Sequence, residues 1–159
     1  MVGLGSGLGL FLAPSASVDG RVFAGARHRA LSVEVGGEAT VPTSMQLDDR
    51  SGFRYQYLAG TLALCGHLGW WSACGVGKLG KIRIRGYGVD NPSLASGVQT
   101  SAGGRLAFTH RLWGPISGMV RADWLASLTS STVEINHTTT WSTPGSGVHL
   151  GLDVGATFE

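Results

Sequence analysis

The sequence predicts an all-β fold, an eight-stranded antiparallel up-and-down transmembrane β-barrel, and three observations predict it. The first is the end of the chain, where every even position from Val148 to Phe158 is apolar and every odd position is polar, charged or glycine. A period of two indicates a strand with one apolar face and one polar face. The second is length, because this stretch matches the ~9–11 residues of a tilted membrane-crossing strand and exceeds the ~5–6 of a typical globular strand.

The third observation is composition. Charged residues make up 14% of the chain and glycine occupies 26 of 159 positions, against usual values of about 25% charged and about 7% glycine. No apolar run reaches the ~18 residues of a transmembrane helix. The length predicts one domain, 1–159. The net charge of +2 and the scattered basic residues argue against a nucleic-acid partner.

Eight strands are expected in order, and all five prolines fall in the connections, where no ladder donor is needed. The expected strands are 4–12, 19–28, 30–41, 53–65, 70–87, 97–113, 117–135 and 147–158. The connections after the second, fourth and sixth strands are short, and those after the first, third, fifth and seventh are longer. This alternation is typical of short periplasmic turns and longer extracellular loops, with both termini on the side of the short turns.

Two segments of this map allow more than one interpretation. Residues 1–13 are expected to hold the first strand, because glycine and apolar residues alternate there. A secretory signal is the other interpretation, but the segment lacks a positively charged start, so a signal peptide is expected to be absent from this sequence. In the fifth strand, Lys78 and Lys81 have opposite parity, which predicts a β-bulge near residues 77–80.

Aromatic residues predict two girdles at the membrane boundaries. One is expected near the long loops and one near the short turns, although a soluble sandwich would bury such residues in its core. The girdle residues are Phe53, Tyr55, Tyr57 and Tyr87 near the loops, and Trp70, Trp71, Trp113 and Phe158 near the turns.

Charged residues on the face opposite the apolar one are expected to form a charge network in the lumen. An eight-stranded barrel is only wide enough for side chains to fill it, and isolated buried charge is costly, so these groups must pair. A structural plug is the preferred interpretation and a gated ion path is the alternative. The network residues are Arg21, Glu34, Glu38, Arg105, Arg121, Asp123 and Asp153.

The two cysteines, Cys65 and Cys74, flank an expected turn at residues 66–69. They are predicted to form a cross-strand disulfide, which the oxidising periplasm permits. A redox pair or a metal site is the alternative, but with only His67 between them they make a poor zinc site.

No catalytic, metal or cofactor site is predicted. The stretch 75–80 matches a dinucleotide fingerprint, but strand-like residues follow it where a phosphate site needs a helix N-terminus. Position 82 is isoleucine, which has no hydroxyl group for magnesium. The five histidines are scattered, and their spacing suggests no catalytic set, so the protein is not expected to be an enzyme.

The chain as a whole resembles the eight-stranded outer-membrane barrels of the OmpA/OmpX type, and more closely small glycine-rich barrels of myxobacteria-like Gram-negative bacteria. The resemblance rests on pattern in the segments 23–27 and 31–38, in the Cys65–Cys74 hairpin and in 151–158. Such barrels often end on an aromatic residue, whereas here Glu159 follows Phe158.

The pattern and the resemblance lead to one functional expectation. The protein is expected to be a non-enzymatic monomer of the cell outer membrane with a filled lumen and a structural or surface-interaction role through its extracellular loops. Membrane lipid or lipopolysaccharide and an unidentified extracellular partner are the expected contacts. A narrow passive pore and a soluble lipocalin-like ligand-binding barrel are the alternatives.

Overall fold

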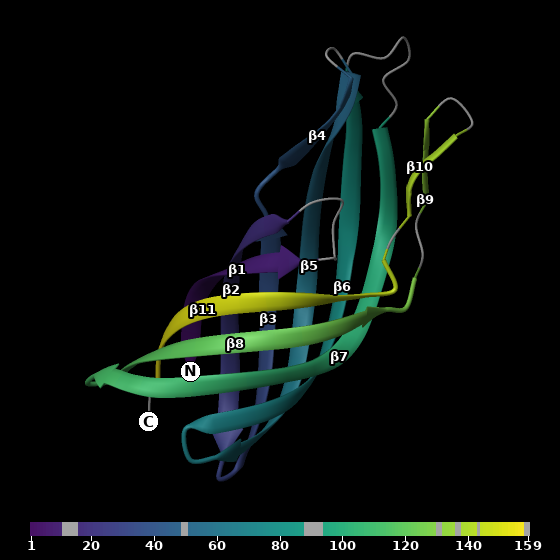
Figure 1. Ribbon diagram of the computed structural model, residues 1–159. Helices are drawn as coiled ribbons and strands as arrows, with labels where there is room; N and C mark the ends of the chain where they lie inside the picture. The colour runs from purple at the N-terminus through teal and green to yellow at the C-terminus, as the bar shows by residue number, and fades with distance from the viewer. Residues whose placement is uncertain are drawn as a thin grey trace.

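The computed structural model describes residues 1–10, 16–48, 51–87, 94–129, 132–135, 138–142 and 144–157. Eight of its strands form one closed antiparallel barrel, in which each strand pairs with its neighbour in the chain, β3 pairs with β5, and β1 pairs with β11. The predicted eight-stranded up-and-down barrel is therefore confirmed (Figure 1). Its strands are β1 (Val2–Leu10), β2 (Ser17–His28), β3 (Leu31–Thr40), β5 (Ser51–Leu68), β6 (Trp71–Tyr87), β7 (Leu94–Trp113), β8 (Ile116–Ser127) and β11 (Ser146–Ala156).

Three further strands lie in connections that were expected to be loops or parts of longer strands. The strand β4 (Thr43–Asp48) pairs with β5, and β9 (Thr132–Ile135) pairs with β10 (Thr138–Ser142) in a separate two-stranded sheet. The expected strand 117–135 is therefore wrong, because the pairing of β8 stops at Ala126 with β11 and at Ser127 with β7. Among the described residues, no helix is long and apolar enough to cross a membrane.

Three two-residue turns connect the barrel strands at one end. They are centred on Arg29, Gly69 and Gly114, each of which has a positive φ of 52° to 61°. A glycine reaches this backbone region without steric cost, which explains two of the three positions. Both chain ends lie at the same end of the barrel (Figure 1), where the backbone N–H of Thr157 donates to the carbonyl of Pro115.

The two faces of the barrel wall have opposite polarity along most of its height. Apolar side chains point outward on each of the eight strands, among them Val33, Val120, Leu150 and Leu152, while the charged side chains of the same segments are buried inside. A lipocalin-like barrel needs apolar residues inside, so this arrangement contradicts that alternative. It fits a barrel with hydrocarbon around it.

The expected bulge near residues 77–80 is wrong. The strand β6 pairs with β5 and β7 in unbroken register through this segment. Lys78 points inward and Lys81 points outward, as their parity requires. The polarity of the two faces of β6 reverses here. On the C-terminal side of Leu79 the outward side chains are charged, and the inward side chains of Ile82 and Ile84 are apolar.

The aromatic girdle expected near the long loops is wrong at two positions, because the polarity of the two faces is reversed there. Tyr55 is only 3% exposed and packs inside against Ile82 and Ile84, and Tyr57 packs against that group. The side chains of Phe53 and Tyr87, and the whole of Phe158, lie outside the described residues. At the other end, the side chains of Trp70, Trp71 and Trp113 are exposed.

The lipid-facing surface gives a depth-dependent prediction. Leu152 is 63% exposed in the middle of β11, and Leu68 is 85% exposed beside a short turn. Arginine at the bilayer midplane costs about 2–4 kcal/mol, whereas near an interface it costs about 0–1 kcal/mol. Leu152→Arg is therefore expected to lower the free energy of unfolding in lipid vesicles by that larger amount, and Leu68→Arg by the smaller. Equal effects of the two substitutions would contradict the membrane-spanning wall.

Candidate functional site: a charge cluster across the lumen

Ten titratable side chains from six strands meet inside the barrel and are named here the lumen charge cluster. Every member is at most 6% exposed. Members on the same strand are two or four residues apart. Because side chains alternate between the two faces of a strand, all of these groups point to the inside of the barrel. The members are Asp19 and Arg21 on β2, Glu34 and Glu38 on β3, Lys78 on β6, Arg105 on β7, Arg121 and Asp123 on β8, and His149 and Asp153 on β11.

Arg21 links three strands at one side of the cluster. Its Nη1 donates to Asp153 Oδ2 at 2.7 Å, and its Nη2 donates to Glu34 Oε1. The same Glu34 oxygen accepts from Arg105 Nη1 at 2.7 Å. The guanidinium of Arg21 also lies over the ring of Phe23, 4.6 Å from its centroid, which adds a cation–π interaction. One carboxylate thus joins β2 to β7 across the lumen.

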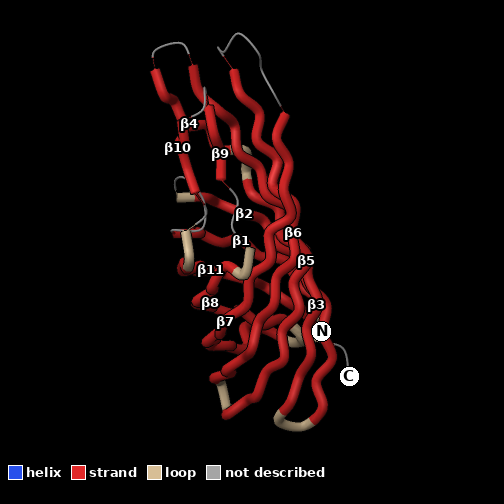
Figure 2. Tube along the Cα trace, turned by 90° about the vertical axis from the view of Figure 1, so that its right-hand side faces the viewer, coloured by secondary structure: helices blue, strands red, loops and turns tan. Residues whose placement is uncertain are grey.

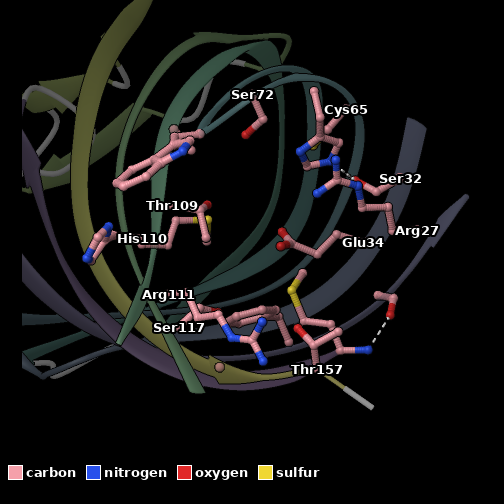
Figure 3. A pocket seen from close by; sticks show the side chains of 18 of the residues that line it. Arg27, Ser32, Glu34, Cys65, Ser72, Thr109, His110, Arg111, Ser117 and Thr157 are labelled. Atoms are coloured by element: carbon pink, nitrogen blue, oxygen red, sulfur yellow. Dashed lines mark hydrogen bonds between the residues drawn. The ribbon is translucent and has the colours of Figure 1, made fainter. Parts of the chain in front are cut away.

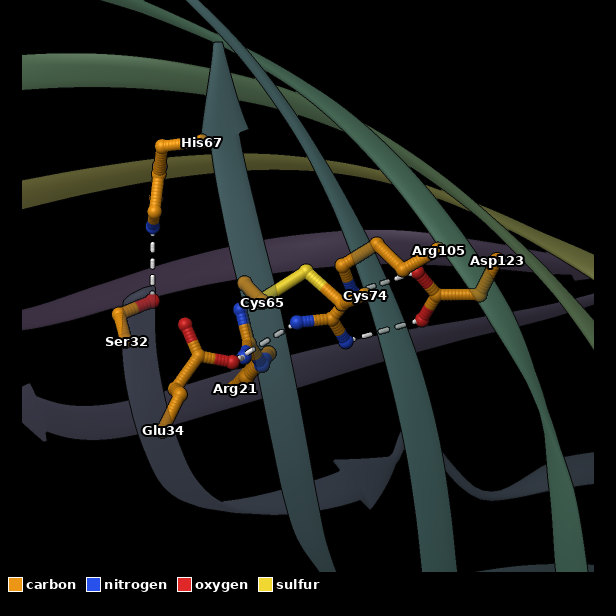
Figure 4. Close-up of a disulfide and its surroundings, with 8 residues drawn as sticks. All are labelled: Arg21, Ser32, Glu34, Cys65, His67, Cys74, Arg105 and Asp123. Carbon is orange, nitrogen blue, oxygen red and sulfur yellow. Dashed lines mark hydrogen bonds and ion pairs between the residues drawn. A yellow bond between two sulfur atoms is a disulfide. The ribbon is translucent and has the colours of Figure 1, made fainter. Parts of the chain in front are cut away.

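Asp123 holds the opposite side of the cluster. It accepts two hydrogen bonds from Arg105, at 2.7 Å from Nε and 3.0 Å from Nη2 (Figure 4), and one from Arg121 Nη1 at 3.0 Å. Such paired donation from a planar guanidinium is the strongest and most directional form of ion pair. Arg121 Nε then donates to Asp153 Oδ2 at 3.0 Å, which closes the chain of contacts back to Arg21.

Two more pairs complete the cluster on the side of the long loops. Lys78 Nζ donates to Glu38 Oε2 at 2.6 Å, and His149 Nε2 lies 2.5 Å from Asp19 Oδ1. The other ring nitrogen of His149, Nδ1, lies 2.8 Å from Arg121 Nη1. A guanidinium can only donate, so Nδ1 accepts and the proton of His149 sits on Nε2, from which it donates to Asp19.

The structure brings together all seven residues proposed from the sequence for the lumen network, and adds three. Asp19 and His149 share the parity of Arg21 and Asp153 on their strands, so the alternation alone could have included them. Lys78 shares the inward parity of Cys74. The assumption of a bulge in β6 removed it from consideration.

Glycines on the inner wall make room for the cluster. A Cβ atom on Gly5 would lie 1.8 Å from Asp153 Oδ1, and one on Gly7 would lie 2.4 Å from the His149 ring. On β11, a Cβ on Gly151 would lie 2.6 Å from the guanidinium carbon of Arg121. The alternating glycines near the start of the chain therefore have a packing role. Large charged side chains fit into the narrow lumen only where the residues that face them have no side chain.

Two cavities lie on either side of the cluster and share no lining residue. The larger, about 910 Å³, opens at the end of the short turns (Figure 3), and its lining includes two members of the cluster, Glu34 and Arg105. The smaller, about 40 Å³, is bordered by Asp19, Glu38, Lys78 and His149. Arg21, Arg121, Asp123 and Asp153 line neither cavity, and the side chain of each is 0% exposed. We name these four buried residues the central layer of the cluster.

The predicted disulfide between Cys65 and Cys74 is confirmed. The two residues lie directly opposite each other on β5 and β6, and the bond faces the larger cavity, next to Arg21, Glu34 and Arg105 (Figure 4). The turn lies at Gly69–Trp70 and not at 66–69, because β5 continues to Leu68. Cys74 also lies opposite Arg105 on β7, so the disulfide borders the lumen charge cluster.

Comparisons with known proteins bear on the fold. No family model and no curated protein matches the chain. Among solved structures, it is similar to Ail, the attachment invasion locus protein of Yersinia pestis, with a TM-score of 0.63 and 10% identity over 99% of this chain and 95% of that chain. The fold is that of an outer-membrane barrel. A second structure of Ail, in complex with the heparin analogue sucrose octasulfate, has a TM-score of 0.55 and 9% identity over the same shares of the two chains.

The pairing in the cluster gives a prediction about stability. Glu38→Ala removes the nearest partner of Lys78 and leaves a buried ammonium group whose next carboxylate, on Asp123, is 3.8 Å away. Breaking a buried pair in this way costs about 3–5 kcal/mol. Glu38→Ala is expected to lower the free energy of unfolding in detergent or vesicles by that amount.

The double variant Glu38→Ala/Lys78→Ala is the matched control. It removes both charges, so it is expected to be less destabilised than the sum of the two single variants. Additive effects of the two substitutions would show that the side chains do not interact in the folded barrel.

Proposed function

We propose that this protein is a monomeric, non-enzymatic barrel of the cell outer membrane, whose lumen is closed by the charge cluster and which acts through the surface it presents on the side of the long loops. The observation that carries the proposal is the layer formed by Arg21, Arg121, Asp123 and Asp153. These side chains bind one another, line neither cavity and leave no exposed surface.

The closed lumen follows from the energetics of this layer. Each charge in it has at least two partners or a short ion pair, and moving one of them out of the way would leave another charge buried without compensation. A narrow passive pore, the alternative function, requires several of these contacts to part at once. With the lumen closed in this way, the larger cavity is a water-accessible recess that opens only on the side of the short turns.

The surface role is supported by the shape of the molecule. The strands β5, β6 and β7 rise beyond the rest of the barrel on one side, and β4 and the β9–β10 hairpin lie at the same end (Figure 2). Strands carry a surface far more rigidly than loops do. The Ail barrel, which has the same fold, has been crystallised with a heparin analogue. That complex supports a role in surface binding for a barrel of this architecture.

The outward apolar residues support the remaining parts of the proposal. They occur on each of the eight barrel strands, which suits a single chain surrounded by lipid, and lipopolysaccharide is the lipid that an outer membrane presents on the side of the long loops. The closer resemblance to barrels of myxobacteria-like bacteria stays a prediction from sequence pattern.

The proposal predicts the electrical behaviour of the purified protein. Wild-type barrel inserted in planar bilayers is expected to show no sustained conductance, because paired side chains occupy the lumen. The variant Arg21→Ser/Arg121→Ser/Asp123→Ser/Asp153→Ser shortens the four side chains of the central layer without changing the net charge and is expected to conduct. Steady channels from wild-type monomer would contradict the closed lumen and favour the pore.

Insertion is verified in the same samples, so that an absence of conductance can be attributed to a closed lumen and not to a failure of the barrel to insert. The folded fraction is measured by the mobility of unheated protein in detergent gels and by protection of the barrel from added protease. The variant Arg29→Asn, which removes an exposed cation at a short turn outside the lumen, is the control and is expected to behave as wild type.

A further inference from the structure

The outer wall of the β5–β6 hairpin carries a group of cations above its apolar part, named here the wall basic patch. Its members are Arg54 on β5 and Lys81, Arg83 and Arg85 on β6, all exposed. Residues two apart on a strand share one face, so the three β6 cations form a row that runs away from the membrane-facing residues. Arg54 lies directly opposite Arg85, and Gln56 directly opposite Arg83.

This arrangement lacks internal charge compensation in the part of the chain that the structure describes. The five carboxylates with described side chains, those of Asp19, Glu34, Glu38, Asp123 and Asp153, are all buried in the lumen. The outward neighbours of the patch on β7 are Ser96 and Val98. Like charges directly opposite each other on paired strands destabilise the pairing. An anion bound outside the wall would remove that repulsion.

The height of the patch on the wall identifies the kind of anion. Below it, the outward positions on β5 are apolar or glycine from Leu58 down to Leu68. At the rise and tilt of barrel strands, this stretch spans about 25 Å, which is the height of the apolar band of an outer-membrane barrel. Lys81 lies directly opposite Leu58. The row of cations therefore begins where hydrocarbon ends and headgroups begin.

The inward face of the same segment supports this placement. Tyr55, Ile82 and Ile84 are buried inside the barrel at the height of the patch. The wall here has a polar outside and an apolar inside, as in a water-exposed structure, whereas the wall below has the reverse. The patch faces sideways toward the surrounding leaflet, and guanidinium and ammonium groups are the side chains that bind phosphate.

We propose that the wall basic patch binds the phosphate groups of anionic lipid headgroups in the leaflet on the side of the long loops, with lipid A as the lipid class. The inference rests on the proposed function for its membrane and its orientation. It assigns to β5 and β6 a lipid-binding surface distinct from the lumen charge cluster and from the loops.

The test compares two variants that lose equal charge. The patch variant is Lys81→Gln/Arg83→Gln/Arg85→Gln, and the control variant is Arg27→Gln/Arg29→Gln/Arg111→Gln, which removes three exposed cations at the end of the short turns. Each barrel is refolded in zwitterionic detergent and titrated with diphosphoryl lipid A, and bound lipid is counted by native mass spectrometry. The patch variant is expected to bind at least about 10-fold more weakly than wild type, given the contribution of each cation near an anionic surface. The control variant is expected to bind as wild type does.

Three results would overturn the proposal. The first is equal binding of lipid A by the patch variant and wild type. The second is equal loss in both variants, which would indicate only a response to net charge. The third is retention of wild-type affinity for lipid A from which both phosphates have been removed.

A soluble polyanion and the proposed function are tested separately. Sucrose octasulfate, titrated in the same way, would identify the patch as a site for soluble sulfated saccharides if it bound through the patch and lipid A did not, and that result too would overturn the lipid assignment. If wild-type barrel fails to insert in bilayers, the proposed function fails. If it inserts and the patch variant binds lipid A normally, only the present inference fails.

Discussion

The structure depends on one constraint, which is that a barrel of eight strands is only wide enough for side chains to fill it, and at the height of the cluster those side chains are charged and buried. Charges in such a space are tolerated only when each has a partner with good geometry. The ring of contacts through Arg21, Glu34, Arg105, Asp123, Arg121 and Asp153 meets this requirement. Because its members come from β2, β3, β7, β8 and β11, the ring ties together strands that are not hydrogen-bonded neighbours.

The same constraint explains the unusual composition. Long charged side chains fill the lumen only where the facing positions have no side chain, so the glycines of β1 and β11 lie against Asp153, His149 and Arg121. With the charges inside, the outer face is left to apolar residues, and the chain as a whole has few charges and many glycines. Composition, lumen and lipid-facing surface are thus three results of one packing solution.

The alternation of side chains allowed much of this to be predicted from the sequence. It places residues on faces, which was enough for eight strands, the disulfide and the seven charged positions that the structure brings together. It does not reveal where the membrane boundary crosses a strand. At that boundary the preferred polarity of the two faces reverses, so Lys81 was interpreted as a change of register and Tyr55 as a lipid-facing aromatic. The alternation also does not predict which residues pair across the lumen, since the contact of Arg105 with Glu34 depends on the curvature and closure of the sheet.

The central claim, that the charge cluster divides the lumen into two separate spaces, is tested most directly by labelling from one side. Thr109 and Ser101 both point inward from β7, but Thr109 lines the larger cavity and Ser101 the smaller. The native cysteines are paired, so Thr109→Cys or Ser101→Cys adds a single free thiol. With the barrel oriented in vesicles, a charged maleimide added on the side of the short turns should label Cys at 109 rapidly and leave Cys at 101 unmodified. Comparable labelling of both positions from that side would show a continuous lumen and contradict the account.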